Sequence, residues 1–278
     1  MMDSDGENLI TTADLEAFER DGVVVIRNAF GEHWLESLAH GVEQNIRAPG
    51  PDATRYTPEG APGKFYDDYC NWQRIDGYRS FVFNSPGAAI VGALMGSNEV
   101  RFYHEHVLIK EPGTHAVTPW HDDLPYYGLE GTQVCSMWLP LGPIPLSVCP
   151  ELVAGSHRWG RRFVPRLFIS HDNYVAVQDN YEQVPDINVQ RDDYPIFAWE
   201  LALGDCIVFH MLTLHGVPGT TELTTRRRAF STRWLGDDAV FATRPWDTSP
   251  PFGDVHLNAG DRMHHASFPL VWKTTTVD

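Results

Sequence analysis

The residues best suited to metal chemistry are His121 and Asp123, in the segment Trp120-His121-Asp122-Asp123. In an extended segment, residues two positions apart point to the same face. The spacing therefore predicts that one imidazole and one carboxylate lie side by side, with Asp122 facing the other way. These are two of the three ligands of a 2-His-1-carboxylate triad, which suits non-heme Fe(II). Alone the pair is a weak signal, because His-x-Asp is common by chance.

The third ligand must come from a distant part of the chain, where His210 and His215 compete in GDCIVFHMLTLHG. They are five residues apart, so on one strand they would face opposite ways. A Gly-Val-Pro-Gly turn follows His215, and a hairpin there would return one arginine of the run 226–228 beside it. A buried guanidinium matches a carboxylate with two hydrogen bonds. This favours His215 as the ligand and His210 as a core histidine. It also predicts that two of the three arginines of the run are solvated.

The elements that position these residues change in character near residue 100. Upstream, the patterns predict a short helix from Thr11 or Thr12 to Gly22, a buried strand over 23–28 and an amphipathic helix over 32–46. They also predict an irregular loop over 48–64 and a helix from Pro86 to Gly96. Downstream, short β-rich runs alternate with Gly/Pro turns. Helices followed by many strands predict a mostly β protein, a jelly-roll barrel buttressed by N-terminal helices.

One domain is predicted for the 278 residues, since barrels of about 200–250 residues routinely form one domain. Within it, residues 1–99 are the helical buttress and loop, 100–240 the barrel core and 241–278 a C-terminal extension. We find no internal repeat and no low-complexity linker.

The charge balance excludes some functions. The chain has 21 Lys and Arg against 37 Asp and Glu, a net charge of −16, which opposes binding to nucleic acid or anionic membranes. Its four cysteines are widely spaced, so neither a zinc knuckle nor a disulfide framework is predicted. The acidic beginning is unlike a signal peptide, and no apolar run reaches the roughly 18 residues of a membrane span. We expect a cytoplasmic protein.

Several ordered motifs together resemble a known family. TPWHDD, MWLPLGPIP, VAGSHRWG, GDCIVFHMLTLHG and RRRAFSTRW are similar to the phytanoyl-CoA dioxygenase-like family of Fe(II)- and 2-oxoglutarate-dependent oxygenases. The likeness covers nearly the whole chain. It implies a double-stranded β-helix and an iron triad of His121, Asp123 and His215. It also implies that O2 and 2-oxoglutarate are cosubstrates, and that Arg227, before Arg228 and an alanine, binds the distal carboxylate of 2-oxoglutarate.

The same resemblance implies further positions and two departures. Lys110, in LIKEPG, and Trp138, in SMWLPL, match residues beside the cosubstrate. The family commonly has a small hydroxyl residue where this chain has Val217, so Arg227 needs another helper. Pro150 replaces a usual glycine, which changes the local loop. Halogenating relatives lack the triad carboxylate, so the presence of Asp123 argues against halogenation.

Pocket residues follow from alternation along the strand that ends at Lys110. His104 and His106 share its face, so all three should point into one cavity. The aromatic-rich segment GKFYDDYCNWQRIDGYRS is a candidate lid and wall, which makes Tyr66 and Trp72 candidate pocket residues. The expected partner is a small or medium-sized metabolite, hydroxylated as 2-oxoglutarate becomes succinate and CO2. No oligomeric state is predicted.

Two alternatives remain open from the sequence. A cupin-like hydrolase or isomerase would use the same histidines and carboxylate with Zn or Mn, and would not need Arg227. A non-catalytic small-molecule-binding barrel could retain the motifs. The presence of all three candidate ligands together with Arg227 argues against the second alternative.

Overall fold

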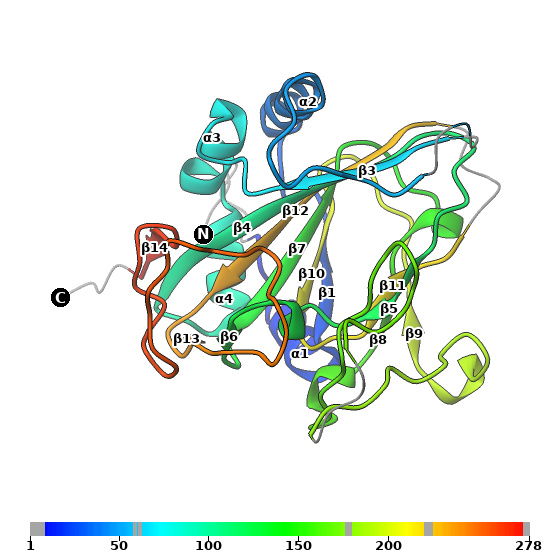
Figure 1. Cartoon of the computed structure of the whole chain (residues 1–278). Coiled ribbons are helices and arrows are strands. Elements are labelled where there is room, and N and C mark those ends of the chain that lie inside the picture. Colours follow the sequence, from blue (N-terminus) through cyan, green and yellow to red (C-terminus); the bar gives the residue numbers. More distant parts are fainter. Residues whose placement is uncertain (1–8, 58–59, 61–62, 176–179, 220–224, 275–278) are drawn as a thin grey trace.

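Two antiparallel sheets form the framework of the computed structural model, which describes residues 9–57, 60, 63–175, 180–219 and 225–274 (Figure 1). The strands are β1 (Val23–Ile26), β2 (Thr54–Arg55), β3 (Phe65–Tyr69), β4 (Glu99–Lys110), β5 (Thr118–His121), β6 (Leu129–Glu130), β7 (Val134–Pro140), β8 (Glu151–Val153), β9 (Ile196–Phe197), β10 (Cys206–His210), β11 (His215–Val217), β12 (Arg227–Leu235), β13 (Val240–Phe241) and β14 (Leu270–Lys273). The larger sheet has the order β1-β10-β7-β12-β4-β3-β2, with β14 beside β4, and the smaller has the order β5-β11-β8-β9.

Within the described ranges, four α-helices accompany the sheets: α1 (Thr12–Asp21), α2 (Glu32–Arg47), α3 (Asp76–Asn84) and α4 (Gly87–Met95). Short 3-10 helices occur at Leu124–Tyr126, Leu146–Val148, Ser156–Arg158 and Arg191–Asp193. A capping box starts α1, because Thr11 Oγ1 accepts from the Asp14 backbone and the Asp14 carboxylate accepts from the Thr11 backbone. Gly22 ends it in the left-handed conformation, with φ of 71°.

The helices cover the outer face of the larger sheet, while its inner face turns toward the smaller sheet (Figure 1). Alternation along the strands separates the two faces. In β4, Val107 and Ile109 join the apolar core beneath the helices, whereas His106 and Leu108 line a cavity between the sheets. The predicted fold, a jelly roll buttressed by N-terminal helices, is confirmed.

Two expectations about the strands are wrong. His210 and His215 do not share a strand: His210 ends β10 in the larger sheet, and His215 begins β11 in the smaller one. No hairpin joins His215 to the arginine run either, because β12 pairs with β4 and β7 while β11 pairs with β5 and β8. The chain crosses between the sheets at 211–214, so the period-two argument does not apply across that segment.

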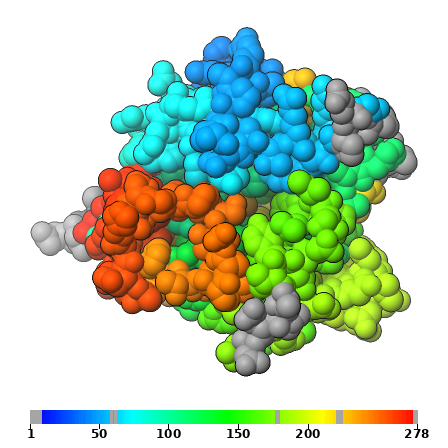
Figure 2. Space-filling model, in the orientation of Figure 1, coloured from blue at the N-terminus to red at the C-terminus, as the bar shows by residue number. Residues whose placement is uncertain are grey.

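The loop predicted over 48–64 is less irregular than expected, since β2 lies within it and pairs with β3. Residues 58–59 and 61–62 of that loop lie outside the described residues. In the space-filling view, the blue and cyan N-terminal part lies at the top (Figure 2). Beneath it, the orange C-terminal segment lies beside the green segment near residue 165. All three contribute to the cavity wall, through Tyr56, Phe168 and Pro250 among others.

Among the described residues, no helix is long and apolar enough to cross a membrane.

Candidate active site

The three predicted metal ligands meet at one point between the sheets. His121 and His215 are directly paired across β5 and β11, with ring centroids 4.2 Å apart. The Nε2 atoms of both lie 3.8 Å from Asp123 Oδ1. One potential ligand atom from each of the three residues lies within 4.8 Å of the others, an arrangement that can hold a metal ion.

Asp123 reaches this point in a way that the sequence did not indicate. β5 ends at His121, and Asp123 has helical backbone angles, with φ of −77° and ψ of −37°. Its backbone N–H donates to the carbonyl of Met211 at 2.8 Å, in the segment that links β10 and β11. The two ligands converge because the chain turns at Asp123, and not because they lie on one extended strand.

The hydrogen bonds of the histidines leave the correct nitrogen free for a metal. His121 Nδ1 lies 2.8 Å from the carbonyl of Pro119, and His215 Nδ1 lies 2.9 Å from that of Thr213. A carbonyl only accepts, so each Nδ1 carries the proton and each Nε2 keeps its lone pair. Burial lowers the pKa of His121 to about 3 and lowers that of His215 as well, which keeps both rings neutral.

Ser136 and Arg233 contact the Asp123 carboxylate at the oxygen that does not face the histidines. Its Oδ2 accepts from Ser136 Oγ at 2.5 Å and lies 3.3 Å from Arg233 Nη2. Burial alone would raise the pKa of Asp123, but Arg233 and the two histidines lower it below its usual range. The group is therefore ionised, and Oδ1 is directed at the histidines. Two neutral imidazoles and one carboxylate with further positions open suit a divalent iron ion.

Asp122 does not line the cavity, but it does not face solvent. Its side chain is buried, and its Oδ2 has no hydrogen-bond partner in the part of the chain that the structure describes. Burial raises the pKa of Asp122 well above its ordinary value and so favours its protonated form.

A cavity of about 290 Å³ opens from the triad between the two sheets. This is close to the lower end of the volumes typical of small-molecule sites. Aromatic rings dominate the wall near the triad, where Phe168 and Tyr126 both contact His121 edge-on. Other lining residues include Thr54, Tyr56, Phe65, Asp67, Tyr69, His104, His106, Leu108, Thr118, Trp138, Leu152, Tyr174, Phe209, Val217, Arg227, Ser231 and Arg233.

The arginine run divides as alternation predicts. Arg227 is buried, lines the cavity and donates to the carbonyl of Val148 at 2.6 Å, with Trp138 beside its guanidinium. Arg226 and Arg228 point outward and both pair with Glu43. The hydrogen-bond partner of the Arg227 guanidinium among the described residues is therefore a backbone carbonyl and not a carboxylate. Burial lowers the pKa of Arg227 to about 10, so it remains a cation that lacks a carboxylate partner among the described residues.

Lys110 is the direct cross-strand partner of Arg227. It does not line the main cavity, contrary to the alternation argument. Its Nζ donates to the carbonyl of Ala116 at 2.5 Å, lies 4.8 Å from the centre of the Phe65 ring, and borders a small crevice with Arg227 and Val217. Burial and, to a smaller extent, the neighbouring Arg227 together lower the pKa of Lys110 to about 6.

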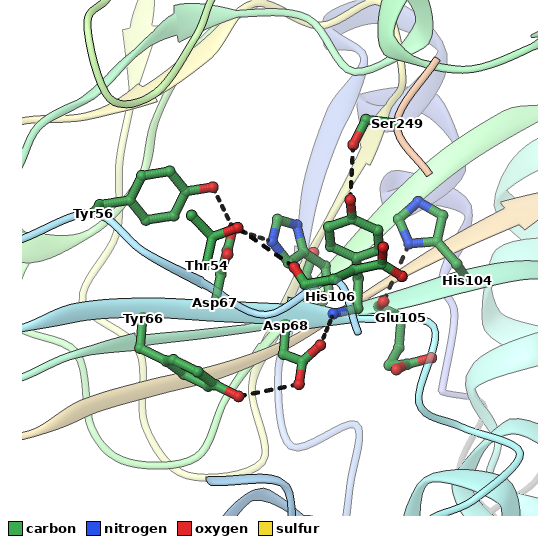
Figure 3. Close-up of polar contacts among 12 residues, drawn as sticks. Thr54, Tyr56, Tyr66, Asp67, Asp68, His104, Glu105, His106 and Ser249 are labelled. Atoms are coloured by element: carbon green, nitrogen blue, oxygen red, sulfur yellow. Dashed lines mark hydrogen bonds and ion pairs between the residues drawn. The ribbon is translucent and has the colours of Figure 1, made fainter. Parts of the chain in front are cut away.

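Two of the four predicted pocket residues lie elsewhere. His104 and His106 line the cavity as predicted. Tyr66 does not, because it is on the helix-facing side of β3 and its hydroxyl donates to Asp68 at 3.0 Å (Figure 3). Trp72 packs in the core against Phe83 and Phe102. The segment beyond residue 70 turns away to form α3, which the sequence analysis did not predict.

Sequence reasoning missed the residues that support the ligands. Ser136 lies two positions before Trp138 in β7, and Arg233 lies six after Arg227 in β12, so strand alternation places each on the inner face of the larger sheet. The same argument finds Ser231. His210 keeps its predicted structural role, since its Nε2 donates to the carbonyl of Thr132 and its Nδ1 accepts from Leu212.

The family profile described as phytanoyl-CoA dioxygenase (PhyH) matches residues 18–229 of the 278. The chain belongs to this family. A comparison with curated protein sequences gave no match.

Solved structures similar to this family member include enzymes of several reaction types. The non-heme alpha ketoglutarate dependent carbocyclase SnoK from nogalamycin biosynthesis is 22% identical with a TM-score of 0.74, over 95% of this chain and 97% of that one. The epimerase SnoN, in complex with Fe3+, alpha ketoglutarate and nogalamycin RO, is 18% identical with a TM-score of 0.73, over 94% and 98%. EctD from S. alaskensis, with 2-oxoglutarate and 5-hydroxyectoine, is 15% identical with a TM-score of 0.64, over 91% and 86%.

Proposed function

We propose that this protein is an Fe(II)- and 2-oxoglutarate-dependent dioxygenase that hydroxylates a small or medium-sized metabolite, converting 2-oxoglutarate to succinate and CO2. The observation that carries the proposal is that the His121, Asp123 and His215 ligand set and the Arg227 guanidinium line one cavity. A hydrolase or isomerase would need the ligand set, but it would have no use for a buried cation without a carboxylate.

Each residue has a distinct part in this proposal. The triad would hold Fe(II), which when bound supplies the activation of O2 for oxidation of a C–H bond. Arg227 would receive the distal carboxylate of 2-oxoglutarate, with Trp138 as a flat wall beside it. Ser136 and Arg233 would keep Asp123 ionised and oriented toward the metal.

Thr118 supplies the hydroxyl that Val217 lacks. Thr118 is the cross-strand partner of Val217, and both side chains line the cavity that also contains Arg227. A hydroxyl donor therefore reaches this end of the cavity from the neighbouring strand. We propose that it helps Arg227 to bind the cosubstrate carboxylate.

The direct test is succinate formation by purified protein with Fe(II), 2-oxoglutarate, O2 and ascorbate. Slow succinate formation is expected even without the true substrate, because the triad and Arg227 bind metal and cosubstrate independently of the rest of the cavity. With an accepted substrate, product mass separates the outcomes. Hydroxylation adds one oxygen atom, ring closure removes two hydrogen atoms, and epimerisation leaves the mass unchanged. Bound iron without any succinate would contradict the proposal.

Lys110 makes 2-oxoglutarate binding depend on pH. With a pKa of about 6, it is mostly neutral at pH 7.5 in the free protein. A carboxylate bound at Arg227, its cross-strand neighbour, favours the charged ammonium and raises that pKa. Binding at pH 7.5 should therefore take up a proton, measured by calorimetry in buffers of different ionisation enthalpy. The uptake should disappear in Lys110→Met, and an equal uptake in that variant would contradict this role.

A further inference from the structure

A second polar cluster lines the cavity away from the triad, centred on Asp67 of β3 (Figure 3). The carboxylate is buried, with 1% of the residue exposed. Its Oδ2 accepts from His106 Nε2 at 2.8 Å and from the Tyr56 hydroxyl at 2.7 Å. Its Oδ1 is also buried, and no described residue donates to it. An unpaired buried acceptor is costly, so this oxygen is suited to a donor carried by a ligand.

His104 presents a second unpaired acceptor in the same cavity. Its Nδ1 lies 3.1 Å from the carbonyl of Glu105, which only accepts, so Nδ1 carries the proton. Burial, together with the cation of Arg233, lowers the pKa of His104 well below its ordinary value, so the ring is neutral. Its Nε2 is therefore an acceptor. It is buried, and it has no partner within the described ranges.

The two acceptors come from different positions along the strands that line the cavity. His104 is opposite Arg233, the residue that pairs with Asp123, so it lies at the end of the cavity beside the triad. Asp67 is opposite Leu108, four residues along β4 from His104. At about 3.3 Å per residue, the backbone positions 104 and 108 are roughly 13 Å apart along the strand, and the Asp67 side chain reaches back to His106, two residues from His104.

The wall between these acceptors is aromatic. The Tyr69 ring contacts both histidines edge-on, at centroid distances of 6.2 Å to His104 and 5.6 Å to His106. Its hydroxyl is held by Ser249 of the C-terminal segment, at 3.2 Å (Figure 3). Phe168 faces the same cavity from the segment near residue 165. Such walls suit flat, apolar rings.

We propose that the substrate of the activity proposed above is a neutral ring compound with a hydroxyl donor at each end, one donating to His104 and the other to Asp67. A hydroxyl suits both acceptors, whereas a cationic amine does not. The charge of Asp67 is already shared with the donors His106 and Tyr56, and the other acceptor lies beside the cation of Arg233. The substrate class rests on the proposed function, but binding can be tested without it.

The first test uses the ligand alone. Equilibrium dialysis of metal-free wild-type protein compares 4,4′-dihydroxybiphenyl with 4,4′-dimethoxybiphenyl, which keeps the rings and oxygens but lacks the donors. The diol should bind about tenfold more tightly or better, as expected for donors to buried acceptors. Equal affinities would overturn the proposal. Tighter binding of 4,4′-bis(aminomethyl)biphenyl than of the diol would overturn the choice of hydroxyl over amine.

The second test changes one acceptor. In Asp67→Asn, the amide oxygen can still accept from His106 and Tyr56, and the amide NH2 then occupies the position of Oδ1. An acceptor becomes a donor, so diol affinity should fall about tenfold and its advantage over the dimethyl ether should shrink. Tyr66→Phe, on the opposite face of β3, should keep the preference. An unchanged preference in Asp67→Asn would overturn the role of Asp67.

The outcomes separate this inference from the proposed function. Thermal melting shows whether Asp67→Asn is folded, and if it is not, the ligand comparison on the wild-type protein decides alone. Succinate formation with equal binding of diol and ether would leave the function standing and remove the substrate class. A clear diol preference without succinate under any condition would remove the function and keep the binding site.

Discussion

Replacing Asp123 by Asn should abolish succinate formation and iron binding. Loss of a residue that merely orients a ligand already costs about 10–100-fold in metal affinity. Removing the charged ligand itself should therefore cost on the order of 100-fold or more. Asparagine is preferred to alanine because it keeps the volume and leaves an oxygen near the buried Arg233, whose charge would otherwise be unpaired. Iron content and succinate yield are the measurements.

Asp122→Asn is the matched control. Asp122 is a buried carboxyl outside the cavity, and burial raises its pKa and favours the neutral form, so an amide replaces it with little change in shape. Iron content and activity should stay near those of the wild-type protein. If Asp122→Asn lost iron while Asp123→Asn kept it, the assignment of the carboxylate ligand would be wrong by one residue.

Replacing Arg227 by Ala should raise the KM for 2-oxoglutarate by about 100-fold, as expected when a buried partner of a charged group is removed. The cause is loss of the one arginine of the run 226–228 that faces the cavity. Arg226→Ala removes a neighbouring cation that pairs with Glu43 and Glu111 at the surface. Its KM should stay within about twofold of the wild-type value, as surface ion pairs contribute little.

Steady-state succinate formation at varied 2-oxoglutarate separates these outcomes. Arg227→Lys keeps the charge but not the two-pronged geometry, so its KM should lie between those of wild type and Arg227→Ala. Equal KM values for Arg227→Ala and Arg226→Ala would exclude Arg227 as the cosubstrate anchor.

Local patterns predicted three of the four described α-helices, α1, α2 and α4, and the ligand set. The capping residues around Thr11 and Gly22, and the apolar spacing along α2, correspond to interactions within a few residues, so the sequence contains them directly. His121 and Asp123 were predictable because their residue types and spacing restrict the chemistry. His215 was preferred to His210 on the family resemblance and on a hairpin that the structure does not contain. Arg227 was assigned from the family resemblance, and strand parity, which puts Arg226 and Arg228 on the opposite face, agrees with the structure.

The errors arose where distant segments decide the outcome. The link between β10 and β11 crosses from one sheet to the other, so His210 and His215 cannot be compared by parity. Asp123 is placed by a hydrogen bond to Met211, 88 positions later in the chain (211 − 123). Tyr66 and Trp72 belong to an aromatic segment that alternates between cavity and helix-facing core, and composition alone does not show where the alternation begins.

The residues that support the ligands, and those of the Asp67 cluster, can be recognised only from contacts between strands that are distant in the sequence. Alternation from Trp138 places Ser136 on the inner face of the larger sheet, but only the packing of β7 and β12 shows that Ser136 and Arg233 meet the same carboxylate. The side chains of Asp67 and His106 form a hydrogen bond between β3 and β4, although His106 lies two positions from Leu108, the direct cross-strand partner of Asp67. No local pattern reveals a hydrogen bond between residues 39 positions apart.

The measurement that most directly tests the assembled site is anaerobic visible spectroscopy of the purified protein. Addition of Fe(II) and then 2-oxoglutarate should produce a weak visible band, because the keto acid end of the cosubstrate chelates the iron and charge transfer between them absorbs visible light. The band should be absent in Asp123→Asn and should need much more 2-oxoglutarate in Arg227→Ala. Iron binding by the wild-type protein with no band at saturating 2-oxoglutarate would contradict the assignment of this cavity to a 2-oxoglutarate-dependent oxygenase.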